Sequence, residues 1–521
     1  MRKIIYILFC LSFIGCNYLE DYSQDLVIAK SVQDVDELLL GSGYLRYGSP
    51  DDIAGGDVGW WIHLLDDDVN GVIAGQANLH SAVQVDVNLL RSTYYGYFCW
   101  QWEVGRNYDK TSLASDASLW NTLYSRINIA NIILAEIQDM DKENEEDELD
   151  AWRVQGEAYF LRAQFYLFLV NIYGDAYAPS TAASKLGVPL KLTEYVEHDP
   201  DRNPQFERAT VQEVYDQIVS DLENAVSCFE RGSQPQSIYR ASREAALLLL
   251  SRVHLYMQNW EGARDRALDV LENRSTLSGL VDSTVFLSTN NAEVIFTQGV
   301  QNLKHGITGT GGEFCVSSDL YNLYSDNDRR KSVWFSLSSR DSIGMDFKYD
   351  RSDNPSYLGD IFMLRTAEAY LNAAEAYAML NDAGNASKYL NDLCRARYTG
   401  YSDQTYTMDN VIQAVRDERR RELCFEGHRW FDLRRYAVCE NEPYKRVIEH
   451  IFPIYDVDEA RFQYAEVYQL EEDDPAYTFA IPKDVLNFDS GMPDNPREIR
   501  EYVRTIVPDD DKEEEEVVPG V

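Results

Sequence analysis

Over much of this chain, apolar residues recur every three or four positions, the spacing that places them on one face of an α-helix. Between residues 119 and 140, for example, Trp120, Leu123, Ile127 and Leu134 form one such stripe. The same pattern predicts single helices over 148–173, 210–229 and 411–436. It also predicts two pairs of helices, over 242–273 and 361–398, each interrupted by a polar turn. We therefore predict a mainly α-helical protein.

Three of these segments carry a small or slim residue three positions before a tyrosine, at Tyr166, Tyr256 and Tyr377. Small residues allow paired helices to approach while the tyrosine fills the next gap, as in tetratricopeptide repeats. The spacing between the three is irregular, which indicates a helical-pair scaffold interrupted by insertions. We place the scaffold mainly at 117–274 and 361–437, with irregular, partly β insertions at about 41–112 and 275–360. Residues 444–508 also lack helical periodicity. Long insertions in a rigid scaffold tend to carry function.

The amino terminus has the pattern of an export signal. Arg2 and Lys3 precede an apolar run over 4–14, which is shorter than the about 20 residues that span a bilayer. Gly15 and Cys16 then complete a bacterial lipobox. We interpret residues 1–15 as a lipoprotein signal peptide and Cys16 as the lipidated first residue of the mature chain, bearing acyl chains such as palmitate. The alternative is an ordinary signal peptide in which this cysteine is accidental.

Charge excludes several classes of partner. The net charge of −39 becomes −41 when Arg2 and Lys3 are removed, which opposes binding to nucleic acid and to anionic membrane surfaces. Polyanionic substrates are disfavoured for the same reason unless a local basic patch exists. The acidic tail at 508–521 is predicted to be disordered. The six cysteines after Cys16 are too widely spaced for a CxxC motif, and we favour buried free thiols over disulfides.

Motifs for catalysis or metal binding are missing from the sequence. The seven histidines show no HExxH or HxH spacing, and neither a GxSxG elbow nor a phosphate-binding loop is present. Residues 66–71 match the first half of a calcium loop, but Ala77 stands where a glutamate ligand is needed, so we favour a solvated acidic turn. Glu418, Glu422 and Glu426 alternate with arginines, as in an ion-paired structural helix. We predict no cofactor, no metal and no enzymatic activity.

Aromatic residues make up 12% of the chain; several cluster in the first insertion, and others fall in the second. Flat rings with a polar edge suit ligands whose apolar faces are bordered by hydroxyl groups, as in sugars. For any single ring, packing in the core remains the favoured alternative. The candidate ligand-binding residues are Trp60, Trp61, Tyr95, Trp100, Tyr321, Tyr324 and Trp334.

Several longer motifs resemble the SusD/RagB family. Residues 119–131 resemble its "W..lY..I..aN" helix, and 156–166 with 173–175 resemble the hallmark that follows. Residues 364–376 match "lR.AE.yLn.AEA", and 416–435 match "ER..E...E..R..DLRR". Near the end, 481–482 and 494–496 resemble "IP…QNP", except that Asp494 replaces the usual glutamine and no glycine follows. The motifs occur in family order over nearly the whole mature chain.

The resemblance implies a single SusD-like domain over 16–521, tethered to the outer membrane and facing the exterior. Such proteins capture oligosaccharides, less often peptides, and deliver them to a SusC-like TonB-dependent β-barrel transporter. Glu20 and Asp21, soon after the lipidated cysteine, fit surface display in this family. The resemblance implies no cofactor. Two alternatives remain open: a surface glycan hydrolase, and a tetratricopeptide-type interaction scaffold without a small ligand.

Overall fold

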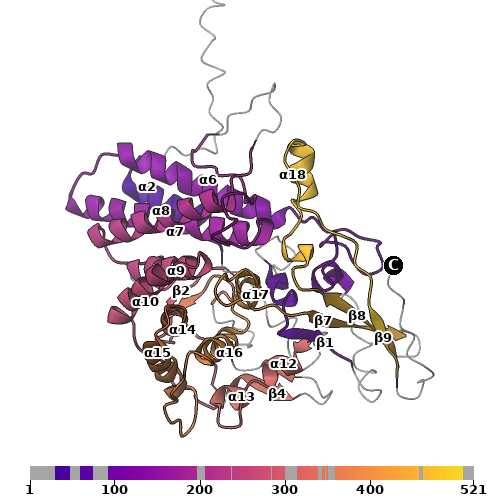
Figure 1. Ribbon diagram of the computed structural model, residues 1–521. Coiled ribbons are helices and arrows are strands. Elements are labelled where there is room, and N and C mark those ends of the chain that lie inside the picture. Colours follow the sequence, from indigo (N-terminus) through magenta and orange to yellow (C-terminus); the bar gives the residue numbers. More distant parts are fainter. Residues whose placement is uncertain are drawn as a thin grey trace, which may run out of the picture.

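The computed structural model describes residues 30–46, 59–73, 92–195, 206–235, 237–282, 284–299, 314–337, 343–345, 348–349, 358–456 and 461–508. The expected signal peptide, Cys16, Glu20, Asp21 and nearly all of the acidic tail lie outside these residues. Within them, the predicted mainly α-helical, tetratricopeptide-like scaffold is confirmed. Figure 1 shows helices stacked on one side of the molecule and most strands gathered on the other.

Seven long helices form the scaffold, and neighbours in sequence pack against each other. Their starts agree with local sequence: Thr210 forms a capping box with Glu213, and side chains of Asn144, Ser242, Asn259 and Asp382 cap four others. The predicted breaks within the two helix pairs are also confirmed. The seven helices are α6 (Ser118–Asp139), α7 (Glu145–Tyr173), α8 (Val211–Arg231), α9 (Arg243–Tyr256), α10 (Trp260–Asn273), α14 (Thr366–Met379) and α15 (Ala383–Arg395).

The single helix predicted over 411–436 is wrong, because the structure contains two helices there. α16 (Val411–Leu423) and α17 (Arg429–Ala437) are separated by a turn in which Phe425 and Gly427 have φ of 59° and 72°. This left-handed backbone ends an α-helix. The turn brings Glu426 to Arg365, whose Nε donates to Oε2 at 2.7 Å. Periodicity alone does not reveal the break because both helices bury the same kind of residue.

Shorter elements occur before and within the first insertion, in the second insertion and in the carboxyl-terminal region. They include α2 (Val32–Leu38), the π-helix η2 (Leu39–Gly43), the 3-10 helix η4 (Trp60–Leu64), α5 (Tyr95–Phe98), α12 (Ser318–Tyr321), α13 (Arg329–Trp334), the 3-10 helix η6 (Pro475–Tyr477) and α18 (Lys483–Phe488). In Figure 1, α18 projects beyond the sheet region, on the side of α6.

Within the described residues, three small antiparallel sheets complete the fold. The first has the order β1-β3-β5-β4, and the second pairs β2 with β6. The third pairs β7 and β8 along their whole length and adds β9 at the edge. The strands are β1 (Val69–Gly71), β2 (Val294–Phe296), β3 (Phe314–Val316), β4 (Phe335–Leu337), β5 (Ile343–Met345), β6 (Leu364–Arg365), β7 (Ile448–Asp456), β8 (Arg461–Leu470) and β9 (Arg504–Ile506).

The third sheet corrects the expectation that 444–508 is irregular. Its strands bury polar side chains as well as apolar ones, which obscures the alternation that identifies a strand. The hydroxyl of Tyr468 donates to Glu466 Oε2 at 2.8 Å, and both side chains are buried. Hydrogen bonding makes such burial possible.

Buried ion pairs hold α16 and α17 against the rest of the core, which confirms the prediction of an ion-paired structural helix. Glu422 is fully buried and accepts hydrogen bonds from Arg330, Arg365 and Arg397. Arg365 belongs to β6, Arg330 to α13 and Arg397 to the segment after α15. The motif around Glu422 therefore links separate parts of the fold through ion pairs.

The acidic sequence at 66–68 is buried, so the expected solvated turn is wrong. Arg429 Nε donates to Asp67 Oδ1 at 2.7 Å, and Arg420 Nε donates to Asp68 Oδ1 at 2.7 Å. These arginines, with Arg446, hold the pKa of the Asp67 carboxyl well below its usual range against the opposing effect of burial. The three carboxylates lie close enough together to consider a metal ion. Their guanidinium partners favour a structural role instead.

The six described cysteines are free thiols, as predicted, and all except the half-buried Cys315 are buried. No disulfide is therefore needed to hold the described part of the chain together.

Candidate functional site

The rings selected from the sequence lie mostly inside the core. Trp100 is 1% exposed and its Nε1 donates to the carbonyl oxygen of Leu65, while Trp334 is fully buried. The hydroxyl of Tyr324 donates to the carbonyl oxygen of Arg421 at 2.7 Å. Such contacts leave no ring face for a ligand in this conformation. They favour packing roles for these three residues.

The other selected rings fall into separate places. Trp61 is buried and stacks on Tyr97 with 4.7 Å between ring centroids. Tyr95 is buried against Tyr468, whereas Tyr321 is half-buried at the edge of Phe335. The backbone of Trp60 belongs to η4, but its side chain lies outside the described part of the structure. The described side chains among the selected rings do not gather around one opening.

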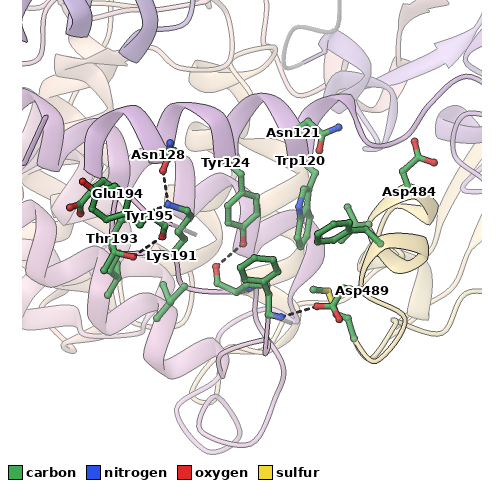
Figure 2. Close-up of a pocket in the computed structure, with 17 residues that line it drawn as sticks. Trp120, Asn121, Tyr124, Asn128, Lys191, Thr193, Glu194, Tyr195, Asp484 and Asp489 are labelled. Carbon is green, nitrogen blue, oxygen red and sulfur yellow. Dashed lines mark hydrogen bonds between the residues drawn. The ribbon is translucent and has the colours of Figure 1, made fainter. Parts of the chain in front are cut away.

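A large cavity lies elsewhere, in a groove between α6, the segment 189–195 and α18. Its volume is about 1080 Å³. Figure 2 shows α6 along one side and α18 at the end that carries Asp484 and Asp489. We call this the α6–α18 groove. It is lined by Trp120, Asn121, Tyr124, Asn128, Pro189, Leu190, Lys191, Leu192, Thr193, Glu194, Tyr195, Phe206, Asp484, Val485, Phe488, Asp489 and Met492.

Aromatic side chains form both the inner wall and the outer edge of the groove. Trp120 is buried and packs edge-on against Tyr173, with ring centroids 5.0 Å apart. It lines the groove together with Tyr124. At the outer edge, Tyr195 is 74% exposed and Phe488 is 66% exposed. These two rings line the same groove as Trp120 and Tyr124, and exposed apolar surface gathered in a groove is typical of ligand-binding sites. The groove therefore has the features of a binding surface.

Polar side chains border these rings. The ammonium of Lys191 donates to Asn128 Oδ1 at 2.5 Å and to the carbonyl oxygen of Thr193 at 2.5 Å. Desolvation lowers the pKa of Lys191. The backbone N–H of Phe206 donates to Asp489 Oδ2 at 2.9 Å. Figure 2 shows these bonds as dashed lines around the rings. Asn121 and Asp484 are exposed at the rim.

The wall formed by 189–195 is held in place by residues of two sequence motifs. Asn131 Nδ2 donates to the carbonyl oxygen of Lys191 at 3.0 Å, and Arg162 Nη1 donates to Asn131 Oδ1 at 2.8 Å. The Tyr166 hydroxyl donates to the same Lys191 carbonyl at 2.7 Å. Tyr124 adds a bond to the carbonyl oxygen of Pro189, also at 2.7 Å. The motif residues thus position a groove as well as the scaffold.

Sequence reasoning missed the groove because its wall comes from three distant segments. Trp120 and Tyr124 belong to a motif that we assigned to the scaffold, while Tyr195 and Phe488 stand in regions without periodicity. The only available signal was a single aromatic residue in each of two segments without helical periodicity, Tyr195 within 191–198 and Phe488 within 483–490. Such single residues are common in surface loops and do not identify a site.

Comparisons with known proteins agree with this fold. A family model described as "Starch-binding associating with outer membrane" matches residues 63–255, and one described as "SusD family" matches residues 344–497. SusD-like protein P25 of Formosa agariphila is 24% identical over 412 residues, which cover 64% of this chain and 74% of that protein. SusD-like protein P2 of the same organism is 21% identical over 62% of this chain and 72% of its own length.

Solved structures show the same architecture. A SusD superfamily protein from Bacteroides thetaiotaomicron superposes with a TM-score of 0.65 at 22% identity, covering 90% of this chain and all of the other (100%). A putative sugar binding protein from Bacteroides vulgatus also gives 0.65, at 23% identity, with 90% and 99% covered. In the described part of this chain, no helix combines the length and apolar character needed to cross a membrane.

Proposed function

The chain belongs to the SusD/RagB family, and from this premise we propose that it is a non-catalytic surface lipoprotein that binds an oligosaccharide. It passes this ligand to a SusC-like TonB-dependent transporter in the outer membrane. The family description associates such chains with starch binding and with the outer membrane. The proposal adds the anchor at Cys16, the transport partner, the absence of catalysis and a specific binding groove.

The α6–α18 groove is the observation that carries the proposal. Its volume of about 1080 Å³ slightly exceeds the roughly 300–1,000 Å³ usual for small-molecule sites. Its exposed rings offer flat apolar faces, and its rim offers amide and carboxylate groups for hydroxyl hydrogen bonds. A sugar chain presents both kinds of surface. The seven rings proposed from the sequence remain candidates, but most of them are buried. Tyr195 and Phe488, which are not among those seven, are therefore the stronger candidates for ligand contact.

The charge of the groove favours a neutral ligand. Among the described residues that line it, Lys191 is the one cationic side chain, whereas three lining residues are carboxylic: Glu194, Asp484 and Asp489. Lys191 already donates to Asn128 and Thr193. A sulfated or uronic-acid-rich chain would bring like charge beside these carboxylates, which weakens binding. Neutral oligosaccharides avoid this repulsion.

Isothermal titration with neutral oligosaccharide series tests the proposal directly. Maltose-, cellobiose-, xylose- and mannose-based series are suitable, together with their longer members. We expect one series to bind, and Tyr195→Ala or Phe488→Ala to weaken it by about threefold to tenfold, since one ring contact contributes roughly 0.5–1.5 kcal/mol. Tyr502→Ala is a matched control, because Tyr502 is 37% exposed and does not line the groove.

The same samples separate binding from hydrolysis. A binding protein leaves the ligand intact, so reducing ends should not increase during prolonged incubation. New reducing ends would replace the proposal with the hydrolase alternative. The absence of measurable binding to every oligosaccharide would also contradict the proposal. Mass spectrometry of the protein purified from membranes tests the anchor, with acylation expected at Cys16 and lost in Cys16→Ser.

A further inference from the structure

We infer that Trp102 forms an outlying sugar subsite beyond the α6–α18 groove, so that the protein grips long oligosaccharides at two places. This inference rests on the proposed function and adds to it the length of the ligand. Its ligand class is the same: a neutral oligosaccharide long enough to extend from the groove, past α18, to Trp102.

Trp102 is unusual among the tryptophans of this chain. It is 41% exposed, whereas Trp61, Trp100, Trp120 and Trp334 are each at most 7% exposed. No other described tryptophan side chain is exposed to the same degree. Tryptophan is the largest side chain and is highly buried on average, so exposing this much of it sacrifices apolar burial. Packing of the fold therefore does not account for the position of this ring.

The ring is nevertheless held in place. The Lys483 ammonium lies 4.8 Å from the ring centroid of Trp102, in a cation–π contact. The same ammonium pairs with the carboxylate of Glu103, which also binds Arg106. Lys483 is thus fixed between an acid and a ring. A ring fixed in this way loses little conformational entropy when a ligand stacks on its remaining surface.

Lys483 also connects Trp102 to the groove. It is the first residue of α18, and the next two residues, Asp484 and Val485, line the groove together with Phe488 at the other end of the helix. Six helical residues rise by only about 9 Å. One short helix therefore has Trp102 against its first residue and the exposed ring of Phe488 at its last.

α18 itself has no buried residue. Its exposed face carries polar groups between the two rings, including Asp484, which is exposed. A sugar chain that leaves the groove along α18 meets a hydrogen-bonding surface and then a second aromatic ring. An aromatic ring, a polar surface and a second aromatic ring in spatial order suit the binding of a polymer of hydroxylated units better than the binding of a single small molecule.

The test is the dependence of affinity on ligand length. We would titrate wild type, Trp102→Ala and Phe488→Ala with a short and a long member of the series that binds, for example maltotriose and maltoheptaose. Trp102→Ala should weaken the long ligand by about threefold to tenfold and leave the short one unchanged. Phe488→Ala should weaken both. Trp152→Ala is a matched control. Trp152 is a partly exposed tryptophan that packs on Arg231 and does not line the groove.

Lys483→Met provides a second measurement that does not remove the ring. It abolishes the cation–π contact and should reproduce part of the loss for the long ligand only. Equal affinity of wild type and Trp102→Ala for the long ligand would overturn the subsite and leave the groove intact. An equal loss for both lengths would overturn it too, by showing that Trp102 acts through the groove. If wild type binds neither length of any series, the proposed function itself fails.

Discussion

Replacing Glu422 by glutamine should destabilise the whole molecule. The carboxylate is fully buried and accepts from Arg365 Nη1 at 2.7 Å, from Arg330 Nη1 at 2.7 Å and from Arg397 Nη2 at 2.8 Å. Arg365 and Arg397 also share Glu293. Glutamine keeps the shape of the side chain but removes the negative charge that three guanidinium groups face.

The magnitude follows from the burial of the charges. Removing one partner of a buried ion pair costs about 3–5 kcal/mol because the other charge is left uncompensated. Glutamine retains one acceptor oxygen, and Glu293, Glu418 and Glu426 still face the arginines. We therefore expect a loss near the lower limit, about 3 kcal/mol in the free energy of unfolding.

The pH dependence has a defined sign. The three arginines hold the pKa of the Glu422 carboxyl well below its ordinary value, against the effect of burial. A lowered native pKa contributes stability above the unfolded value, and this contribution disappears as pH falls through the native value. The difference between wild type and Glu422→Gln should thus be constant above about pH 5 and shrink in acid.

Urea unfolding followed by tryptophan fluorescence measures the effect as a shift of the midpoint at unchanged slope. Glu223→Gln is the matched control because Glu223 is exposed on α8, and it should change the free energy by less than about 0.5 kcal/mol. A loss below about 1 kcal/mol for Glu422→Gln would refute the reasoning. It would mean that the remaining carboxylates neutralise the arginines without Glu422.

Three further outcomes are expected. Gly427→Ala should lower the free energy of unfolding by about 1–3 kcal/mol, which is more than the loss expected for Gly400→Ala. Both glycines have positive φ, but only at 427 would an added Cβ meet the Cα of Ile361, at 3.2 Å. Equal losses of stability in thermal unfolding would contradict the role of this contact. The ring nitrogens of His450 lie 2.7 and 2.8 Å from the carbonyl oxygens of Phe98 and Asp66. Burial lowers the pKa of this imidazole to about 4, so we expect a neutral ring at pH 7 with one nitrogen donating to its carbonyl oxygen; ¹⁵N shifts of an imidazolium would disprove this. Reducing agent should leave the melting temperature unchanged, because the six described cysteines are free thiols.

Local patterns were sufficient for the helices that carry the scaffold. The stripe over 119–140 and the small-residue-to-tyrosine repeats depend only on neighbours three or four positions apart, so the sequence reports them directly. The same patterns did not find the break at 424–428 or the strands β7 and β8. In both places, buried ion pairs and hydrogen bonds bring polar residues into the interior, where periodicity expects apolar ones.

The site required more than local pattern. Trp100 and Trp102 are two positions apart and look equivalent in the sequence, yet one is 1% exposed and the other 41%. The difference depends on Leu65, which accepts a hydrogen bond from Trp100, and on Lys483, which holds Trp102 from far along the chain. Neither partner can be deduced from the residues around the two rings.

The sequence by itself determined the helical scaffold, the family motifs and the acidic character of this protein, because each is written in the spacing or number of its residues. Tertiary structure decided which rings are exposed, which carboxylates are neutralised and where a groove opens. These properties depend on contacts between segments hundreds of residues apart, as between Trp102 and Lys483 or between Asp67 and Arg429. Burial is a property of the folded molecule, and only the fold assigns it to a particular side chain.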